Sequence, residues 1–360
     1  MRTLVVSDLH LGRSGGSDLL RRADLREPLL EAVDGADRLV ILGDALELRE
    51  AAHRDAMETA APLFEALGRA GKELIVVAGN HDHGLAAGWI DARLQSEPSG
   101  FLGLEQSFAP AEAGPLARRL AEAAPQLQLA YPGLWLRDDV YAFHGHYADV
   151  HATVPTFERL AAGTMARFVA RLPGGRATPD DYEAVLSPLY AWLHALTQRS
   201  DHTVISAGAG ASASTYLKLT RRGSLPLMVG YRAAVAALNL AGLGPLEPSL
   251  SPSALRRGYL HGIREVIERL DLRAPYVLWG HSHRAGPWPS DDAGDWTAPT
   301  GTRIVNTGSW VYQPHFLGPE PHGSPYWPGT AAIVDDDGPP RLVRLLGDRG
   351  HAELSARGPA

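Results

Sequence analysis

The sequence LIVVAGNHD occupies residues 74–82 and turns from apolar to polar at Gly79. A short run of β-branched and other apolar residues bounded by glycine is typical of a buried strand. The residues that follow place an amide, an imidazole and a carboxylate directly at the end of that strand. Because open α/β sheets usually hold their ligands at the carboxyl ends of strands, this stretch predicts a functional site at the edge of a sheet.

The same change from apolar strand to polar residues recurs at four other places, in a fixed order along the chain. The motifs are Asp8-Leu9-His10 after residues 4–6, Gly43-Asp44 after residues 39–42, His144-Gly145-His146 after residues 141–143, and Gly280-His281-Ser282-His283 after residues 276–279. One such motif would carry little weight, because short motifs often match by chance. Five motifs in order, each just after a strand, predict one common site.

These residue types suit a pair of divalent cations. The chain has no cysteine, so a metal must be held by nitrogen and oxygen ligands. Two cations about 4 Å apart can bind both ends of an in-line phosphoryl displacement and activate a water molecule. Such a pair needs a bridging carboxylate, and Asp44 is suited to bridge because it is the only acid of its motif directly at the strand end.

The remaining motif residues fit the same chemistry. Asp8 and His10 are two positions apart and point to one side of the chain, and His281 and His283 share that spacing. Asn80 offers a carbonyl oxygen without adding negative charge. His81 is predicted to be a general acid that protonates the leaving oxygen, with the neighbouring Asp82 orienting its imidazole.

Apolar strands and amphipathic helices alternate through residues 1–146. Helices are expected near residues 18–33 and 57–70, because apolar residues recur there at helical spacing and a glycine follows each run. A hairpin is expected at residues 134–143. Alternation of strand and helix predicts an α/β fold with a largely parallel sheet.

The strand signals fade between residues 147 and 257 and return afterwards. Helices are expected near residues 157–172, after Thr178 and after Ser251, and later strands near residues 303–305, 331–334 and 342–345. The predicted organisation is therefore a core of residues 1–146 and 258–350, split by a helical insertion of residues 147–257. Both ends of the insertion lie next to metal motifs. We therefore expect a lid that selects a bulky, partly apolar substrate, with a dimer interface as the alternative.

Two stretches of the insertion bear on this lid. The Gly/Ala/Ser-rich run at residues 206–214 is expected to be a flexible joint. The apolar stretch at residues 225–246 has the length of a membrane span, but Pro226, Arg232 and Asn239 interrupt it. A buried cap helix is therefore preferred, and contact with a membrane surface is the second interpretation.

The composition is that of a soluble globular protein, with 45% hydrophobic and 21% charged residues. A net charge of -7 argues against a nucleic-acid binder that depends on neutralising phosphates. The sequence runs into its first strand at residue 4 with no pattern of a secretory leader, so a cytoplasmic location is expected.

The order Asp-x-His, Gly-Asp, Gly-Asn-His-Asp, His, Gly-His-x-His resembles that of the calcineurin-like metallophosphoesterases, over residues 1–146 and about 258–345. The resemblance implies a four-layer α/β/β/α sandwich with two divalent metal ions, of which manganese, iron and zinc are all candidates. Carried over by motif, one metal would be held by Asp8, His10, Asp44 and His283, and the other by Asp44, Asn80, His144 and His281. His81 would be the acid, supported by Asp82.

Within this family, the placement of the insertion is similar to that of the UDP-2,3-diacylglucosamine pyrophosphatases. The chain departs from their pattern at His81, where they have arginine, and at His146, where they have aspartate, so the role of His146 stays open. The expected function is hydrolysis of a phosphomonoester, phosphodiester or pyrophosphate by metal-activated water, with a lipid-linked or nucleotide-diphosphate substrate as a candidate. A nuclease of the same fold and a non-catalytic metal-binding scaffold are the alternatives.

Overall fold

The computed structural model describes residues 1–96, 100–198, 225–318 and 320–355. Its strands form one mixed sheet, made of β1 (Thr3–Val6), β2 (Arg38–Leu42), β3 (Glu73–Val77), β4 (Glu105–Phe108), β5 (Leu127–Arg137), β6 (Val140–Phe143), β7 (Tyr276–Trp279), β8 (Arg303–Asn306), β9 (Thr330–Val334) and β10 (Arg341–Arg344). The order across the sheet is β10-β9-β1-β2-β3-β5-β6-β7-β8, and β4 pairs with β5 outside this path. All five strands predicted to precede the polar motifs are present.

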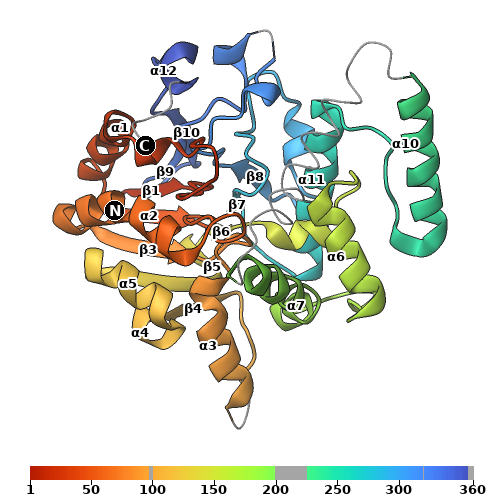
Figure 1. Ribbon diagram of the computed structural model, residues 1–360, viewed down its shortest axis with the longest axis horizontal. Coiled ribbons are helices and arrows are strands. Elements are labelled where there is room, and N and C mark those ends of the chain that lie inside the picture. Colours follow the sequence, from red (N-terminus) through yellow and green to blue (C-terminus); the bar gives the residue numbers. More distant parts are fainter. Residues whose placement is uncertain (97–99, 199–224, 319, 356–360) are drawn as a thin grey trace. The chain divides into compact units, whose positions relative to one another are not determined.

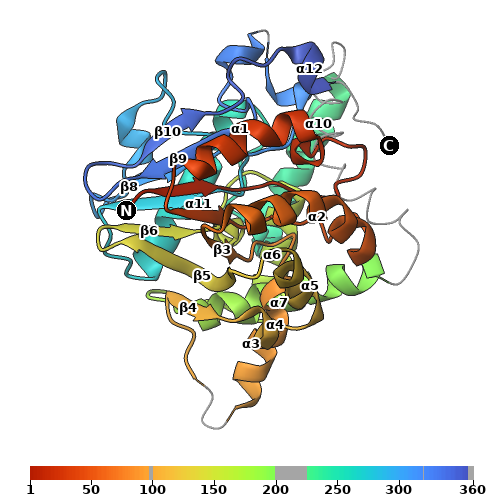
Figure 2. The same cartoon turned by 90° about the vertical axis from the view of Figure 1, so that its left-hand side faces the viewer.

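The long strand β5 joins two parallel groups of strands. β1, β2, β3 and the first part of β5 are parallel to one another, and β6, β7 and β8 form the second group. The predicted hairpin at residues 134–143 is confirmed, because β5 and β6 pair antiparallel, as Figure 2 shows in yellow. Ala130 of β5 pairs with Val77 at the end of β3, and Gly133 pairs with Phe143 at the end of β6. The carboxyl ends of both groups therefore meet near the middle of β5.

Helices follow the strands of the first half of the chain, coloured red to yellow in Figure 1. They are α1 (Ala23–Asp34), α2 (His53–Ala70), α3 (Gly84–Gln95), α4 (Pro110–Ala113) and α5 (Pro115–Ala123). The two predicted helices are present, with starts shifted to residues 23 and 53. Their apolar faces share one buried cluster with the sheet, in which Leu29 of α1 and Phe64 of α2 lie among strand residues such as Ile41.

A second buried cluster consists of strand residues alone. It includes Val5, Val40, Ile75, Leu134 and Leu278, and every other buried member also lies on a strand. In this cluster strands therefore pack on strands, as the two inner layers of a sandwich require. The α/β class is confirmed. The strands are linked in one continuous sheet, and the four-layer arrangement stays a prediction.

The chain forms two compact units. The first comprises residues 1–145, 274–297 and 301–360, and the second comprises residues 146–273 with 298–300. In its described part the second unit is helical, with η2 (His146–Val150), α6 (Phe157–Phe168), α7 (Pro179–Gln198), α10 (Leu225–Leu238), the π-helical turn η3 (Asn239–Leu243) and α11 (Pro252–Arg269). Contacts thus group α11 with the helical unit, whereas the predicted insertion ended at residue 257. The expected joint at residues 206–214 lies outside the described residues.

The apolar stretch that begins with α10 is exposed. Residues Pro226–Leu243 are long and apolar enough to cross a membrane by length and composition, and only 6% of this window is buried. Leu227, Val229 and Leu240 are all exposed. The preferred prediction of a buried cap helix is therefore wrong for this window, because apolar composition alone does not say what covers a helix.

Candidate metal centre

Residues of all five polar motifs come together in the first unit, each in the loop that follows its strand. Backbone hydrogen bonds tie these loops to one another: the amide of Asp8 donates to Gly43 at 3.1 Å, and that of His10 donates to Asp44 at 2.8 Å. The amide of Gly280 donates to the carbonyl of His144 at 2.9 Å. The loops therefore form one connected scaffold, built at the meeting point of the two parallel groups.

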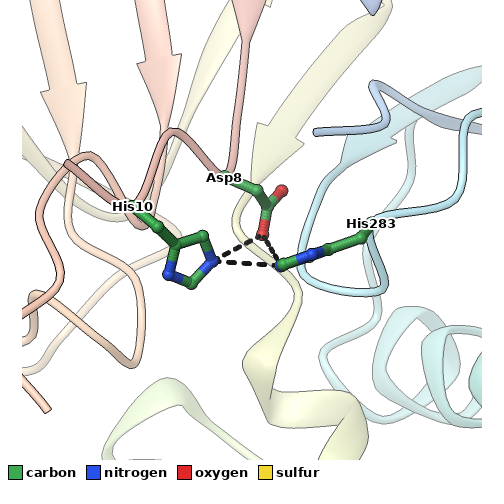
Figure 3. Close-up of side chains that lie close together, drawn as sticks. All are labelled: Asp8, His10 and His283. Carbon is green, nitrogen blue, oxygen red and sulfur yellow. Dashed lines mark hydrogen bonds and ion pairs between the residues drawn. The ribbon is translucent and has the colours of Figure 1, made fainter. Parts of the chain in front are cut away.

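Asp8, His10 and His283 form the first group of converging side chains (Figure 3). His10 Nε2 lies 3.0 Å from His283 Nε2, and both nitrogens face Asp8 Oδ1, at 4.0 Å and 3.4 Å. Asp8 and His10 are buried, and His283 is half-buried. Three ligand atoms from the ends of two strands, β1 and β7, thus converge on one place.

Asp44, His144 and His281 form the second group. His144 Nε2 lies 3.2 Å from Asp44 Oδ2, and the side-chain oxygen of Asn80 lies 3.1 Å from both His144 Nε2 and His281 Nδ1. The amide oxygen therefore completes this group as the motif assignment requires.

The Asp44 carboxylate lies between the first and the second group of side chains. Its Oδ2 lies 3.5 Å from His10 Nε2 and 3.2 Å from His144 Nε2, so one carboxylate faces an imidazole of each group. A third group, made of His10, Asp44 and His81, overlaps the first. Two adjacent sets of nitrogen and oxygen donors that share one carboxylate fit two divalent cations, because such sites use a bridging carboxylate and separate imidazoles.

The opposite ring nitrogens of three histidines are held by acceptors. His10 Nδ1 lies 3.0 Å from Glu47 Oε2, His144 Nδ1 lies 3.0 Å from the carbonyl of Leu42, and His283 Nδ1 lies 3.1 Å from Gln313 Oε1. A proton on Nδ1 in each case leaves the Nε2 lone pair for a cation. Such outer contacts fix the tautomer and the orientation of metal-binding histidines.

Several residues of the site have backbone conformations that non-glycine residues usually avoid. Positive φ values occur at Asp8 (54°), His10 (46°), Asp44 (53°), His281 (66°) and His283 (58°). This left-handed region costs a non-glycine residue about 1–2 kcal/mol. Strain of this kind persists where the surrounding structure enforces it and clusters at functional sites. Five of the seven predicted metal ligands therefore share one strained conformation.

Two glycines permit the close approach of these loops. A Cβ at Gly43 would lie 2.2 Å from Nδ1 of His144, and a Cβ at Gly79 would lie 2.2 Å from Oδ1 of Asp44. Gly43 also has a φ of +85°. Both positions need glycine because any larger residue would displace a predicted ligand.

Glu47 is a site residue that the sequence analysis missed. Its carboxylate is buried between two imidazoles, 3.0 Å from His10 Nδ1 and 2.8 Å from His81 Nδ1. Its other oxygen accepts the backbone amides of Arg49 and Glu50. The available signal was an acid isolated within the apolar run Ala45-Leu46-Glu47-Leu48, since a buried charge needs partners.

The predicted link between Asp82 and His81 is wrong. The Asp82 carboxylate instead accepts backbone amides of Gly79 at 2.6 Å and Ala45 at 2.7 Å, with those of Asp44 and Leu46 each at 3.2 Å. A buried carboxylate is satisfied best by converging N–H donors, and the two loops supply them. Asp82 therefore holds the loops together, while Glu47 orients His81.

The carboxylates differ in how readily they ionise. Burial alone would raise the pKa of Asp44, but His144, His81 and His10 outweigh it and hold that pKa well below its usual range. The same holds for Glu47, where His81 and His10 overcome burial. Burial and the nearby charge of Asp44 raise the pKa of Asp82 to about 6. Asp44 and Glu47 are thus ionised beside the imidazoles, and contacts with His283 also lower the pKa of Asp8 despite its burial.

His146 belongs to the second unit and to none of the three groups described above. It is buried, and its ring contacts those of Tyr147 and Tyr190 at 4.9 Å and 5.6 Å between centroids. These contacts are typical of a packed aromatic cluster. Its role stays open.

Residues 1–168 match the sequence model of a family described as calcineurin-like phosphoesterase. A structure from Thermus thermophilus is 11% identical and covers 96% of this chain and 98% of its own, with a TM-score of 0.34. A dimetal phosphatase from Danio rerio is 11% identical and covers 96% and 99%, with a TM-score of 0.33. No curated protein sequence matches the chain.

Proposed function

We propose that the chain hydrolyses a phosphoester or pyrophosphate with two cations that share Asp44, because residues 1–168 match the calcineurin-like phosphoesterases and two groups of possible metal ligands share this carboxylate. The family generally consists of metal-dependent phosphoester hydrolases. In the proposed assignment, Asp8, His10, Asp44 and His283 hold one cation, and Asp44, Asn80, His144 and His281 hold the other. The observation that carries this assignment is the convergence of two donor groups on the single Asp44 carboxylate.

The surrounding protein positions the bridging carboxylate. The backbone amide of His81 donates to Asp44 Oδ1 at 2.8 Å, which leaves Oδ2 facing His10 and His144. Bound there, two divalent cations would supply an activated water near neutral pH and stabilise charge on the phosphoryl oxygens. The neutral Asn80 limits the negative charge that an incoming phosphate meets.

His81 is the proposed proton donor to the leaving oxygen. Glu47 holds its Nδ1, and its Nε2 lies 3.3 Å from Nη1 of Arg49. The buried carboxylate beside the imidazole fixes the direction of the ring. The nearby guanidinium adds positive charge where a phosphate would bind.

The substrate class belongs to the proposal as well. We favour a lipid-linked or nucleotide-diphosphate substrate, because the placement of the insertion is similar to that in UDP-2,3-diacylglucosamine pyrophosphatases and the helix at residues 225–238 is apolar. A nuclease is less favoured because the net charge is -7. A non-catalytic scaffold is less favoured because every element of the family motif is present. Manganese is the proposed metal and the cytoplasm the proposed location.

The proposal is tested by metal analysis together with a hydrolysis screen over phosphomonoesters, phosphodiesters and nucleotide-diphosphate lipids in Mn²⁺. The wild-type protein should bind two ions per chain and hydrolyse at least one class. Asp44→Ala should lose at least one ion and all activity. Two tightly bound ions in Asp44→Ala would contradict the ligand assignment, and no hydrolysis of any class by the two-metal protein would contradict the enzyme function.

A further inference from the structure

A cavity lies in the first unit, and none of the predicted metal ligands lines it. Its volume is about 890 Å³, and both edge strands of the sheet contribute to its wall. β8 supplies Arg303, Ile304 and Val305, and β10 supplies Leu342 and Arg344. Both strands carry labels in Figure 2. A cavity of this size is ordinary for a small-molecule site, which spans roughly 300–1,000 Å³.

The wall is mainly apolar. Tyr276, Trp288 and Trp296 contribute aromatic rings, and the prolines at positions 287, 289, 339 and 340 add rigid apolar surface. Rings and prolines offer stacking surface at a small cost in side-chain entropy. Such a wall is suited to a planar aromatic ligand.

Two arginines give the wall a positive charge. The Arg303 guanidinium lies 5.8 Å from the ring centre of Tyr276, and that of Arg344 lies 5.7 Å from Trp288. Among the described residues neither has an acidic partner, and no acidic residue lines the cavity. The neighbouring Arg284 differs, because Asp291 binds it at 2.7 Å and 2.8 Å. The charge of Arg303 and Arg344 is thus left for a ligand.

One polar group of the wall is also unsatisfied. Trp288 donates its indole N–H to the carbonyl of Gly323 at 3.0 Å. The indole N–H of Trp296 is buried and has no acceptor among the described residues. This nitrogen has almost no accessible surface, so the ligand contacts come from the aromatic faces and the two arginines.

We propose that this cavity is a second binding site, for a ligand that joins a planar aromatic ring to a negatively charged group, as a nucleoside monophosphate does. The ring would stack between the aromatic and proline side chains, and the anion would lie between Arg303 and Arg344. Because the ligand contacts both edge strands, its binding should also raise the thermal stability of the first unit.

Calorimetric titration of the full chain with adenosine 5′-monophosphate, in the presence of a metal chelator, tests the site. Adenosine supplies the ring without the charge, and inorganic phosphate supplies the charge without the ring. The nucleotide should bind at least about tenfold more tightly than either, because the charged group and the ring should each add at least about 1.4 kcal/mol to the binding free energy.

Substitutions locate the binding. Arg344→Gln and Trp288→Ala should each weaken nucleotide binding about tenfold or more. Arg341→Gln is the matched control, since Arg341 lies on the same strand, faces Asp335 at 3.7 Å and does not line the cavity. It should bind within about twofold of the wild type. Equal affinity for nucleotide, adenosine and phosphate would overturn the proposal, and so would unchanged nucleotide affinity in both cavity variants.

Discussion

Glu47 contacts two imidazoles of the candidate metal centre at once. Its carboxylate is buried between His10, a predicted ligand, and His81, the proposed acid. Removing it would free both imidazoles to rotate and to change tautomer at once. Since both imidazoles depend on it, its loss should reduce metal affinity and proton transfer together.

We predict that Glu47→Gln lowers metal affinity or kcat by about 10–100-fold, the usual effect of losing an outer-shell partner. The amide keeps the shape of the side chain but not its charge. Metal content and kcat with Mn²⁺ measure the effect. Glu31→Gln, at an exposed position of α1, is the control and should match the wild type. Wild-type metal content and kcat in Glu47→Gln would contradict this role of the Glu47 carboxylate.

Gly43 gives a second prediction, in which every ligand is kept. Gly43→Ala should abolish binding of at least one metal, because its Cβ would overlap the ring of His144. Gly71→Ala is the matched control: it also has a positive φ, of +65°, but nothing lies within 4 Å of the added atom. It should cost some stability and leave metal binding intact. Equal metal content in both variants would contradict the argument.

The predicted ligands could be found from the sequence because each follows a strand whose length and apolarity are visible. Sheet geometry then brings strand ends together, as it does for Asp8 and His283. The roles of Glu47 and Asp82 could not be found that way. They depend on which buried N–H groups and imidazoles converge on each carboxylate, and that is decided by loop conformation.

At the scale of elements, apolar periodicity located the helices but not their first turns. α2 begins at His53, four residues before the predicted start, because its opening residues His53, Arg54 and Asp55 are polar. α1 begins later than predicted, because residues 19–21 form a separate 3₁₀ turn. The sequence analysis also missed the first half of β5, since only the second half pairs with β6 in the predicted hairpin.

The contact between η2 and α7 provides a prediction on pH. His151 donates to or accepts from the hydroxyl of Tyr182 at 2.8 Å, and burial, with the charges of Arg269, Arg159 and His261, lowers its pKa to about 3. The unfolded imidazole titrates near 6.5. Below that pH the unfolded chain binds a proton that the folded chain does not, so stability falls as the pH is lowered from 6.5 towards 3.

His151→Gln removes this titration and keeps a polar side chain at the same place. Between pH 7 and pH 5, the wild type should lose about 2 kcal/mol more unfolding free energy than the variant does. Urea unfolding at the two pH values measures the difference. His322→Gln, at an exposed position, should follow the wild type. Parallel losses in the wild type and His151→Gln would contradict the prediction.

At the scale of the whole molecule, the sequence separated a helical unit from an α/β unit by the loss of strand signals. It did not reveal that residues Pro226–Leu243 are largely exposed. Hydropathy measures how unfavourable the contact of a residue with water is, and it does not show which groups surround that residue in the folded chain. The apolar residues of this window are largely exposed on all sides of the helix. This arrangement favours contact with lipid or with an apolar substrate over a dimer interface, which would cover only one side of the helix.

We predict that the triple variant Leu227→Asn, Val229→Asn, Leu240→Asn loses affinity for phospholipid vesicles, or activity on a lipid-linked substrate, by at least about tenfold. Its activity on a small aryl phosphate should stay within about twofold, since the variant leaves the metal groups intact. Phe101→Asn is the control, because Phe101 is 90% exposed in the first unit. Unchanged vesicle binding and lipid hydrolysis, with a new monomeric state, would favour a dimer interface.

The left-handed backbone at five predicted ligands has a consequence for how this protein can change. Each of those positions holds a shape that glycine would adopt at less cost, so stability and chemistry pull in opposite directions there. If only folding were selected, these five residues should be among the first to be substituted. A library of variants selected for thermal stability should therefore be enriched in substitutions at Asp8, His10, Asp44, His281 and His283. The most stable of these variants should have the lowest hydrolytic activity.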